Sequence, residues 1–426
     1  MRPTGSDVAA AVLRDERVHF FFGIPGIQNL AMYAGLERAG SRAVLIANEE
    51  SAAFAAAGVF EASGGTEIAC VNIIGGPGVT HALAGIALAM QQQIPMLVLT
   101  AGIKTGAAHK SHRFQLHDVD NLGILRPVTK LAIAPASDGE IEDVLRRAVR
   151  VATTPPYGPV GVEMPSDMMG DFISGSLPAG KPPRPPTSNA MRTDTRPTNP
   201  LPVPLMDALD ANAHALAAAA PLLCAALNAA IDADATFAAD PGPCSALLAQ
   251  LSGRRLLRPP PHASVGYAVP TAIGAALFEA RARGDAASAG APVVALSDPQ
   301  ALLMTGPELT TAANERLPLL ILVPAIGRAS GAAPPPFLFE AQLDLAAFAA
   351  SFGFPYRRHA AAAGTADAAE AAIRDALAEL SGGQVRLEPP DPLHTQPRPS
   401  SATLPRTQPR PPPPPPPPGV YPPPPP

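Results

Sequence analysis

The chain has 426 residues, of which 47% are hydrophobic and 16% charged, and its formal net charge is −5. This length is enough for two or three domains with a sizeable core. Its basic residues form no block, which argues against a dedicated nucleic-acid-binding protein. No apolar run approaches the ~20 residues of a membrane-spanning helix. The three cysteines form no CxxC pair, and the N-terminus lacks a signal-peptide pattern. We therefore expect a cytoplasmic protein that binds neither nucleic acids nor membranes.

Proline predicts where the folded parts begin and end. Nine prolines lie within residues 177–204 and 20 lie within residues 389–426. Such segments lack apolar periodicity and backbone donors, so they favour linkers and extended polyproline-II structure. We predict one domain over residues 1–172, a Pro-rich linker over 173–205, a second domain over 206–388 and a disordered polyproline tail over 389–426.

In chain order, the first domain alternates helix-like and strand-like segments. Ser6 is a candidate cap for a first helix. The predicted strands are 19–26, 43–47, 67–75, 95–101 and 158–165, and the helices that separate them include 50–61, 78–90 and 141–151. Short, fully apolar strands separated by helices are typical of a parallel sheet that is covered on both faces.

The second domain repeats this alternation. We predict helices near 218–231, 266–284 and 308–314, two later helices, and strands at 235–239, 291–298, 317–323 and 382–388. The sequence therefore predicts an α/β fold with two doubly wound parallel-sheet domains in tandem. In such sheets, ligands bind at the carboxyl ends of the strands.

Two Gly-rich loops and an acidic residue follow predicted strands of the first domain. The loops are GIPG, which ends at Gly26, and GGPG, which includes Gly76 and Gly78. Bare backbone N–H groups there could approach an anion or a ring, although such turns often need glycine for conformational reasons alone. Glu49 follows the strand 43–47. Its position leaves two readings open, a favourable charge near a helix N-terminus, worth about 0.3–1 kcal/mol, or a chemical role.

Several segments together resemble a known family. GIPG, NEESAAFAAAG, GGPGVTHALAGIALAM, IPMLVLTA, FQLHDVDNLGILRPVTK and GPVGVEMPSD occur in one order. This order resembles the pyrimidine-binding domain of thiamine-diphosphate-dependent enzymes, close to acetolactate synthase and 2-hydroxyacyl-CoA lyase. The resemblance implies that Glu49 is the activating glutamate, held against N1′ of the aminopyrimidine. It also implies a catalytic role for Phe114 and Gln115, which face the reaction centre, and cofactor contacts for Gly26, Gly76, Pro77 and Gly78.

Four histidines of the first domain are candidate acid–base groups. They are His81, His109, His112 and His117. No spacing pattern separates a catalytic from a structural role for any of them, and both readings stay open. We rank His117 and His81 first.

The second domain resembles the diphosphate-binding partner domain of the same family. SVGYAVPTAIGAAL matches the turn and helix that hold the aminopyrimidine, with Val265 supporting the bent cofactor and Gly266 beside it. Asp298 matches the aspartate of the family's metal motif, which implies Mg²⁺ as a second cofactor, since this ion prefers oxygen ligands.

This second resemblance has departures. Pro299 stands where the family has glycine, and it lacks a backbone N–H group. The residues after the strand 317–323, Pro324 and Ala325, include no asparagine as a second ligand, and Pro243 replaces a glutamine. Only the Pro-rich linker stands where related synthases carry a central, FAD-binding domain, so FAD is not expected.

Three functions compete on this evidence. The first is a homodimeric or tetrameric thiamine-diphosphate-dependent enzyme that acts on a small-molecule 2-oxo acid or 2-hydroxyacyl substrate, by carboligation, decarboxylation or C–C cleavage. The second is a catalytically impaired paralogue with a binding or regulatory role. The third is a nucleotide-dependent oxidoreductase, which the absence of a GxGxxG motif disfavours. The tail either docks on a proline-recognition domain or is a compositional expansion without a partner.

Overall fold

The protein is described from a computed structural model. The structure describes residues 2–104, 116–117, 119–173, 177–178, 223–232, 234–251, 254–257, 259, 264–284, 292–323, 344–354 and 366–381. The predicted tail, and nearly all of the predicted linker, lie outside these residues. The boundaries between the domains therefore stay a prediction.

The first half of the chain is built around a parallel sheet. Its strands are β1 (Val18–Gly23), β2 (Arg42–Leu45), β3 (Ile68–Ile74), β4 (Leu97–Gly102), β5 (Leu131–Ile133) and β6 (Val160–Pro165). They lie side by side in the order β2-β1-β3-β4-β6-β5, and every pair is parallel. The central strands β3 and β4 are buried almost throughout, as expected for apolar strands that are covered on both faces.

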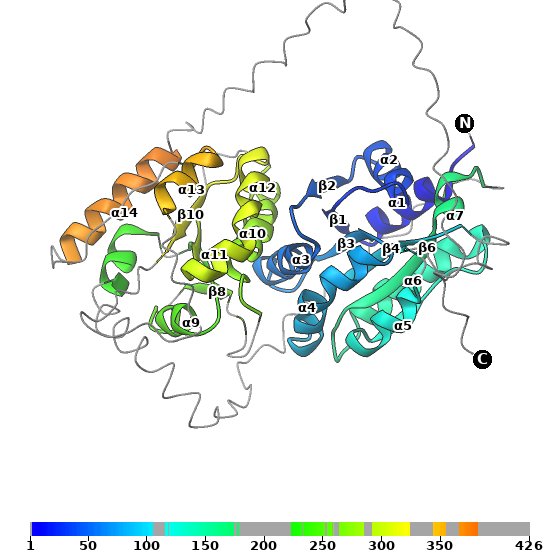
Figure 1. The fold of residues 1–426 in the computed structure, drawn as a ribbon, viewed down its shortest axis with the longest axis horizontal. Coiled ribbons are helices and arrows are strands. Elements are labelled where there is room, and N and C mark those ends of the chain that lie inside the picture. The colour runs from blue at the N-terminus through cyan, green and yellow to red at the C-terminus, as the bar shows by residue number, and fades with distance from the viewer. Residues whose placement is uncertain are drawn as a thin grey trace, which may run out of the picture. The chain divides into compact units, whose positions relative to one another are not determined.

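Helices cover this sheet on two sides (Figure 1). They are α1 (Gly5–Asp15), α2 (Leu30–Arg38), α3 (Glu49–Ala62), α4 (Pro77–Gln91), α5 (Asn121–Leu125), α6 (Ile141–Ala152) and α7 (Ser166–Gly170), with short 3-10 turns η2 (Arg126–Val128) and η3 (Asp138–Glu140). Helix α1 packs against α2 and α6, whereas α3 packs against α4. This division follows from right-handed crossovers that run in both directions along the sheet.

The first helix does not begin at the predicted cap. Thr4 is the N-cap residue of α1, where its hydroxyl accepts a hydrogen bond from the backbone N–H of Asp7 and the Asp7 carboxylate accepts one from the N–H of Thr4. Ser6 lies inside α1 and donates a hydrogen bond to the carbonyl of Met169 over 2.8 Å. The prediction of Ser6 as the cap was therefore wrong, because Thr4 forms the reciprocal capping box instead.

The second half of the chain holds a second parallel sheet. Its described strands are β7 (Thr236–Ala239), β8 (Arg255–Leu257), β9 (Val293–Leu296) and β10 (Leu319–Leu322), in the order β10-β9-β7-β8. The described helices are α9 (Pro243–Leu248), α10 (Ala268–Ala282), α11 (Pro299–Thr305), α12 (Leu309–Asn314), α13 (Leu345–Ser351) and α14 (Ala366–Ser381), with a 3-10 turn η4 (Gly306–Glu308). The strand predicted at 382–388 lies outside the described residues.

The two parallel sheets confirm the predicted fold class. In the first sheet the strand order reverses between β1 and β3, and in the second it reverses between β7 and β9. Crevices at such points bind ligands in doubly wound folds. The loops that carry Gly26 and Gly76 follow β1 and β3, and the loop that carries Asp298 follows β9.

The two halves meet through a pair of helices that are rich in small residues. Helices α3 and α10 lie against each other. A Cβ atom on Gly58 of α3 would lie 2.1 Å from the carbonyl oxygen of Thr271, and one on Gly274 of α10 would lie 1.9 Å from that of Ala55. Glycine at these two positions therefore permits the close approach of the helices. The largest buried apolar cluster accordingly contains residues of both halves.

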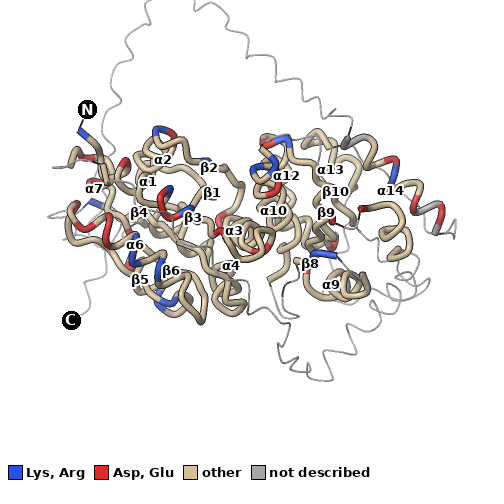
Figure 2. The backbone as a smooth tube through the Cα atoms, turned by 180° about the vertical axis from the view of Figure 1, so that it is seen from behind, with Lys and Arg blue, Asp and Glu red and all other residues tan. Residues whose placement is uncertain are grey.

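Charged residues are interspersed over the described helices and form no basic band (Figure 2). Among the helices that the structure describes, none is both long enough and apolar enough to cross a membrane.

Candidate functional site

The GIPG loop turns against the end of β3. The side chain of Asn29 accepts a hydrogen bond from the N–H of Gly26 over 2.7 Å and donates one to the carbonyl of Ile24 over 3.2 Å. A Cβ on Gly26 would lie 2.7 Å from Cγ2 of Ile74, the last residue of β3. The GIPG loop thus places the backbone of Gly26, which carries no side chain, near the point between β1 and β3 where the strand order reverses.

The GGPG loop is fixed in a conformation that only glycine adopts readily. Gly76 has a φ of +69° and caps α4, whose first residue is Pro77. Its N–H donates to Oδ1 of Asn121 over 2.8 Å, and a Cβ at this position would lie 2.2 Å from the carbonyl oxygen of Leu116. The sequence analysis missed Asn121, because a lone asparagine 45 residues away carries no signal of this contact.

Glu49 stands beside this loop. It is the first residue of α3 and not, as predicted, the residue before the helix, because Asn48 is the N-cap and accepts a hydrogen bond from the N–H of Glu50. Its carboxylate is 7% exposed. Oε2 lies 3.3 Å from Nδ1 of His81, and Oε1 lies 3.6 Å from the position that a Cβ of Gly78 would take. The structure thus brings together Glu49, Gly78 and His81.

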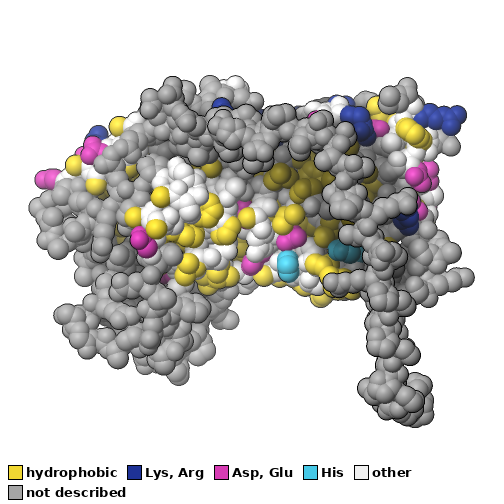
Figure 3. Space-filling view, turned by 45° about the horizontal axis from the view of Figure 1, so that its top comes forward, with side chains coloured by type: hydrophobic (Ala, Val, Ile, Leu, Met, Phe, Trp, Pro, Cys, Tyr) yellow, Lys and Arg dark blue, Asp and Glu magenta, His cyan; other side chains and the backbone are white. Residues whose placement is uncertain are grey.

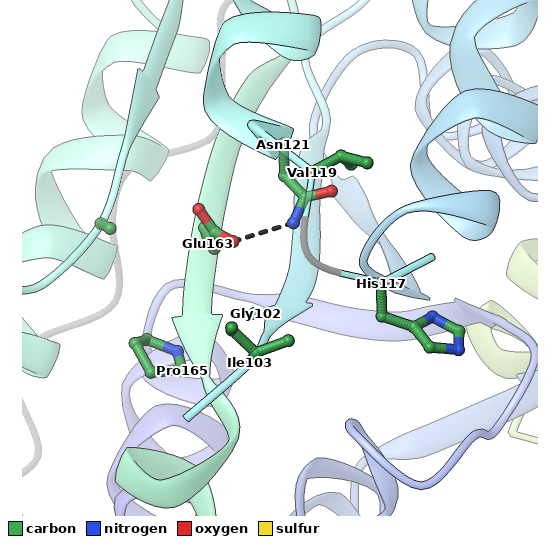
Figure 4. Close-up of a pocket in the computed structure, with 8 residues that line it drawn as sticks. Gly102, Ile103, His117, Val119, Asn121, Glu163 and Pro165 are labelled. Atoms are coloured by element: carbon green, nitrogen blue, oxygen red, sulfur yellow. Dashed lines mark hydrogen bonds between the residues drawn. The ribbon is translucent and has the colours of Figure 1, made fainter. Parts of the chain in front are cut away.

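A cavity of about 220 Å³ is lined in part by His117 and Asn121, which contact Gly75 and Gly76 of the GGPG loop (Figure 4). Its lining includes His117, whose Nδ1 lies 3.1 Å from the carbonyl oxygen of Gly75, and Glu163, which accepts a hydrogen bond from Nδ2 of Asn121 over 2.9 Å. The other lining residues are Gly102, Ile103, Val119, Ala134 and Pro165. His117 therefore does not join the pair of Glu49 and His81. Phe114, Gln115, His109 and His112 lie outside the described residues.

In the second half, Asp240 ties three elements together at the point where the strand order reverses. Its carboxylate accepts hydrogen bonds from the N–H of Ala268 over 2.9 Å, the hydroxyl of Ser297 over 2.7 Å and the N–H of Asp298 over 3.2 Å. Burial raises the pKa of the Asp240 carboxyl, and the hydrogen bond from Ala268 acts in the opposite direction. The sequence analysis missed Asp240, since nothing in its local pattern shows that it joins β7, β9 and α10.

Asp298 acts as the N-cap of α11. Its Oδ1 accepts a hydrogen bond from the N–H of Gln300 over 2.8 Å, and Pro299 is the first helical residue. Within the described part of the chain, no group of three or more His, Cys, Asp or Glu side chains could hold a metal ion. Pro324 and Ala325 lie outside the described residues, and the role of Asp298 as a metal ligand stays a prediction.

The turn 264–266 lies next to the helix that carries Glu49. The side chain of Ser264 forms a hydrogen bond with the Glu50 carboxyl. Burial raises the pKa of this carboxyl, and the hydrogen bond from Ser264 opposes the rise in part. Val265 is 42% exposed. Gly266 has a φ of +92°, and a Cβ there would lie 2.7 Å from Cγ2 of Thr305. Val265 and Gly266, two predicted cofactor contacts of the second half, therefore follow directly after a residue that contacts the first turn of α3.

One further contact between the halves involves Glu308, which the sequence analysis did not single out. Its carboxylate accepts hydrogen bonds from the backbone N–H groups of Ala47 and Asn48. Burial raises the pKa of the Glu308 carboxyl, while the hydrogen bond from Ala47 lowers it.

Comparison with known proteins relates both halves to one family. The model of the N-terminal TPP binding domain of thiamine pyrophosphate enzymes matches residues 3–124, and that of their C-terminal TPP binding domain matches residues 240–324. A solved structure from Mycobacterium smegmatis, described as a putative thiamin diphosphate-dependent enzyme, superposes with a TM-score of 0.64 and 17% identity. It covers 88% of this chain and 97% of that chain, which shows that the fold is shared.

Three relatives of known description match part of this chain. The acetolactate synthase large subunit of Haemophilus influenzae is 32% identical over 165 residues, which are 38% of this chain. Human 2-hydroxyacyl-CoA lyase 2 is 31% identical over 182 residues, 42% of this chain. A probable 2-ketoarginine decarboxylase of Pseudomonas aeruginosa is 28% identical over 272 residues, 64% of this chain. The matched parts span only 28%, 28% and 46% of the lengths of these three proteins.

Proposed function

This chain belongs to the thiamine pyrophosphate enzyme family, and from that premise we propose that it is a thiamine-diphosphate-dependent enzyme acting on a 2-oxo acid or 2-hydroxyacyl substrate. The observation that carries the proposal is the position of Glu49. It is a buried carboxylate at the start of α3, next to the backbone of Gly78, which lies in the first turn of α4 after β3.

The residues around Glu49 fit the aminopyrimidine end of the cofactor. A flat ring needs a hydrogen-bonding carboxyl group, which Glu49 supplies, beside glycine backbone, which Gly78 supplies. When bound, thiamine diphosphate supplies the electron sink for making or breaking a C–C bond beside a 2-oxo group. The role of Glu49 is to hold a proton at N1′ of the pyrimidine, and His81 is within reach of the same carboxylate.

The second half supports the proposal through the turn 264–266. We assign the support of the cofactor to Val265, which is exposed, and to Gly266, which follows it in the same turn. Phe114 and Gln115 remain proposed catalytic residues on the resemblance alone. Asp298 remains a proposed Mg²⁺ ligand, and no step of the reaction is assigned to the metal.

A second candidate function is favoured by the Asp298–Pro299 segment. The carboxylate of Asp298 already caps α11, and Pro299 offers no N–H to a diphosphate oxygen. These two features suit a paralogue that has lost metal-dependent cofactor binding and acts in binding or regulation.

Isothermal titration with thiamine diphosphate, with and without Mg²⁺, separates the two functions. The enzyme predicts binding that requires the metal, with a Kd that rises when the metal is removed. The regulatory paralogue predicts no heat of binding in either titration.

We also propose a homodimer or homotetramer in the cytoplasm. Hydrophobic side chains gather on one face of the molecule, with acidic and histidine side chains among them (Figure 3). Large exposed apolar residues occur at Ile27, Leu30, Val265, Leu303 and Met304. The three cysteines are free and buried, in keeping with a reducing compartment. Docking of the tail on a proline-recognition domain remains a proposal from its composition.

A further inference from the structure

The connection that leads into α3 is held by a side chain from the other half of the chain. Oε1 of Glu308 accepts hydrogen bonds from the N–H of Ala47 over 3.1 Å and from the N–H of Asn48 over 3.0 Å. Glu308 is 1% exposed, so water does not compete for these contacts. Ala47 and Asn48 lie between β2 and α3, immediately before Glu49.

Further contacts also occur between the same two segments. The hydroxyl of Thr311 lies 2.9 Å from the carbonyl oxygen of Leu45 and 2.9 Å from Oε2 of Glu308. Farther along, the guanidinium of Arg42 forms an ion pair with Glu315 over 2.6 Å. Residues 308–315 therefore run beside residues 42–48. We call the group of Glu308 and Thr311 the clasp.

We infer that Glu308 is a positioning residue for Glu49. By accepting the N–H groups of Ala47 and Asn48, it fixes the point at which α3 begins, and therefore where the carboxylate at the first helical position lies. The inference rests on the proposed function, because it concerns the same site.

A buried carboxylate is suited to this task. Backbone N–H groups that lose their acceptor inside a protein must move toward another partner. Here the movement would occur one and two residues before Glu49. A displacement of about 1 Å in a reacting group can cost about a hundredfold in rate. Glu308 lies ten residues beyond Asp298, the proposed Mg²⁺ ligand.

The test compares Glu308→Ala and Glu308→Gln with Glu315→Gln as the matched control. The control removes an acidic charge from the same segment, but one that contacts Arg42 and not the start of α3. Three quantities are measured on the full chain: the Kd for thiamine diphosphate in the presence of Mg²⁺, the exchange rate of the cofactor's thiazolium C2 proton, and the deuterium uptake of the backbone around residues 45–52.

We expect Glu308→Ala to slow C2 exchange about ten- to a hundredfold and to raise deuterium uptake at residues 45–52, while Kd changes by less than about threefold. Glu308→Gln keeps one acceptor oxygen and should show a smaller loss. Glu315→Gln should match the unmodified chain in all three measurements.

Unchanged C2 exchange in Glu308→Ala would overturn the inference, and so would an equal loss in Glu315→Gln. If the unmodified chain itself shows no C2 exchange, the proposed function fails. Deuterium uptake then decides alone whether Glu308 holds the start of α3: increased uptake in Glu308→Ala supports the clasp, and unchanged uptake refutes it.

Discussion

Nδ1 of His81 lies 3.3 Å from Oε2 of Glu49, although 32 residues separate them in the sequence. The glutamate is buried at the start of α3, whereas the histidine side chain is 65% exposed on the first turns of α4. The pair therefore joins a buried carboxylate to a histidine at the protein surface.

Replacement of His81 should have a modest effect. A hydrogen bond of this kind contributes about 0.5–1.5 kcal/mol, and exposure to solvent favours the lower end. We expect His81→Ala to slow C2 exchange of bound thiamine diphosphate about two- to tenfold and to leave the Kd for the cofactor unchanged. A loss of a thousandfold or more would mean that His81 is itself a proton-transfer group and not a partner of Glu49.

The contact of α3 with α10 depends on Gly274. A Cβ there would lie 1.9 Å from the carbonyl oxygen of Ala55, so Gly274→Ala must push the helices apart. We expect a loss of more than about 2 kcal/mol in the free energy of unfolding, which urea denaturation measures. Gly139→Ala is the matched control, since its Cβ would meet only Oγ of Ser137, at 3.8 Å. Equal stability of the two variants would contradict the described packing.

Asp240 should make stability depend on pH. Burial raises the pKa of its carboxyl in the folded state above the usual value for aspartate. Its contribution to stability is therefore fully present below the unfolded pKa and is lost as the pH rises through the folded pKa. Asp240→Asn lacks this titration. Urea denaturation between pH 4 and pH 8 should show the variant gaining stability relative to the unmodified chain as the pH rises. A constant difference would show that Asp240 does not titrate differently in the two states.

Restoring the family's metal motif should strengthen cofactor binding. An unmade hydrogen bond to a charged group costs about 1.5–3 kcal/mol, so two restored contacts correspond to about two to four powers of ten in Kd. The variant combines Pro299→Gly with Ala325→Asn. A second variant carries Pro324→Asn in place of Ala325→Asn, because the family's asparagine could correspond to either of these two consecutive positions. Titration with thiamine diphosphate and Mg²⁺ measures the change. No gain in either variant would favour the regulatory paralogue over the enzyme.

The fold was predictable because its signals are local. Apolar runs such as that of β4 need only burial on both faces to form parallel strands. Ser6 was mistaken for the cap because the sequence offers two hydroxyl side chains, Thr4 and Ser6, and only the reciprocal contact of Thr4 with Asp7 distinguishes them.

The candidate site was predictable in part. Glu49 and the GGPG loop stand next to strand ends, so their position follows from the strands. Asn121, Asp240 and Glu308 act through contacts with residues 45, 28 and 261 positions away, respectively. Contacts at such separations depend on the arrangement of the sheets and leave no mark in the local sequence.

The measurement that tests the central claim most directly is the exchange rate of the thiazolium C2 proton of thiamine diphosphate, followed by proton NMR in deuterated buffer. The full chain is compared with Glu49→Gln. The amide has nearly the shape of the carboxyl group but cannot share a proton with N1′ of the pyrimidine. We predict that the unmodified chain accelerates exchange over the free cofactor, and that Glu49→Gln abolishes this acceleration while its fold and its Kd stay nearly unchanged. An equal rate in both proteins would contradict the role of Glu49.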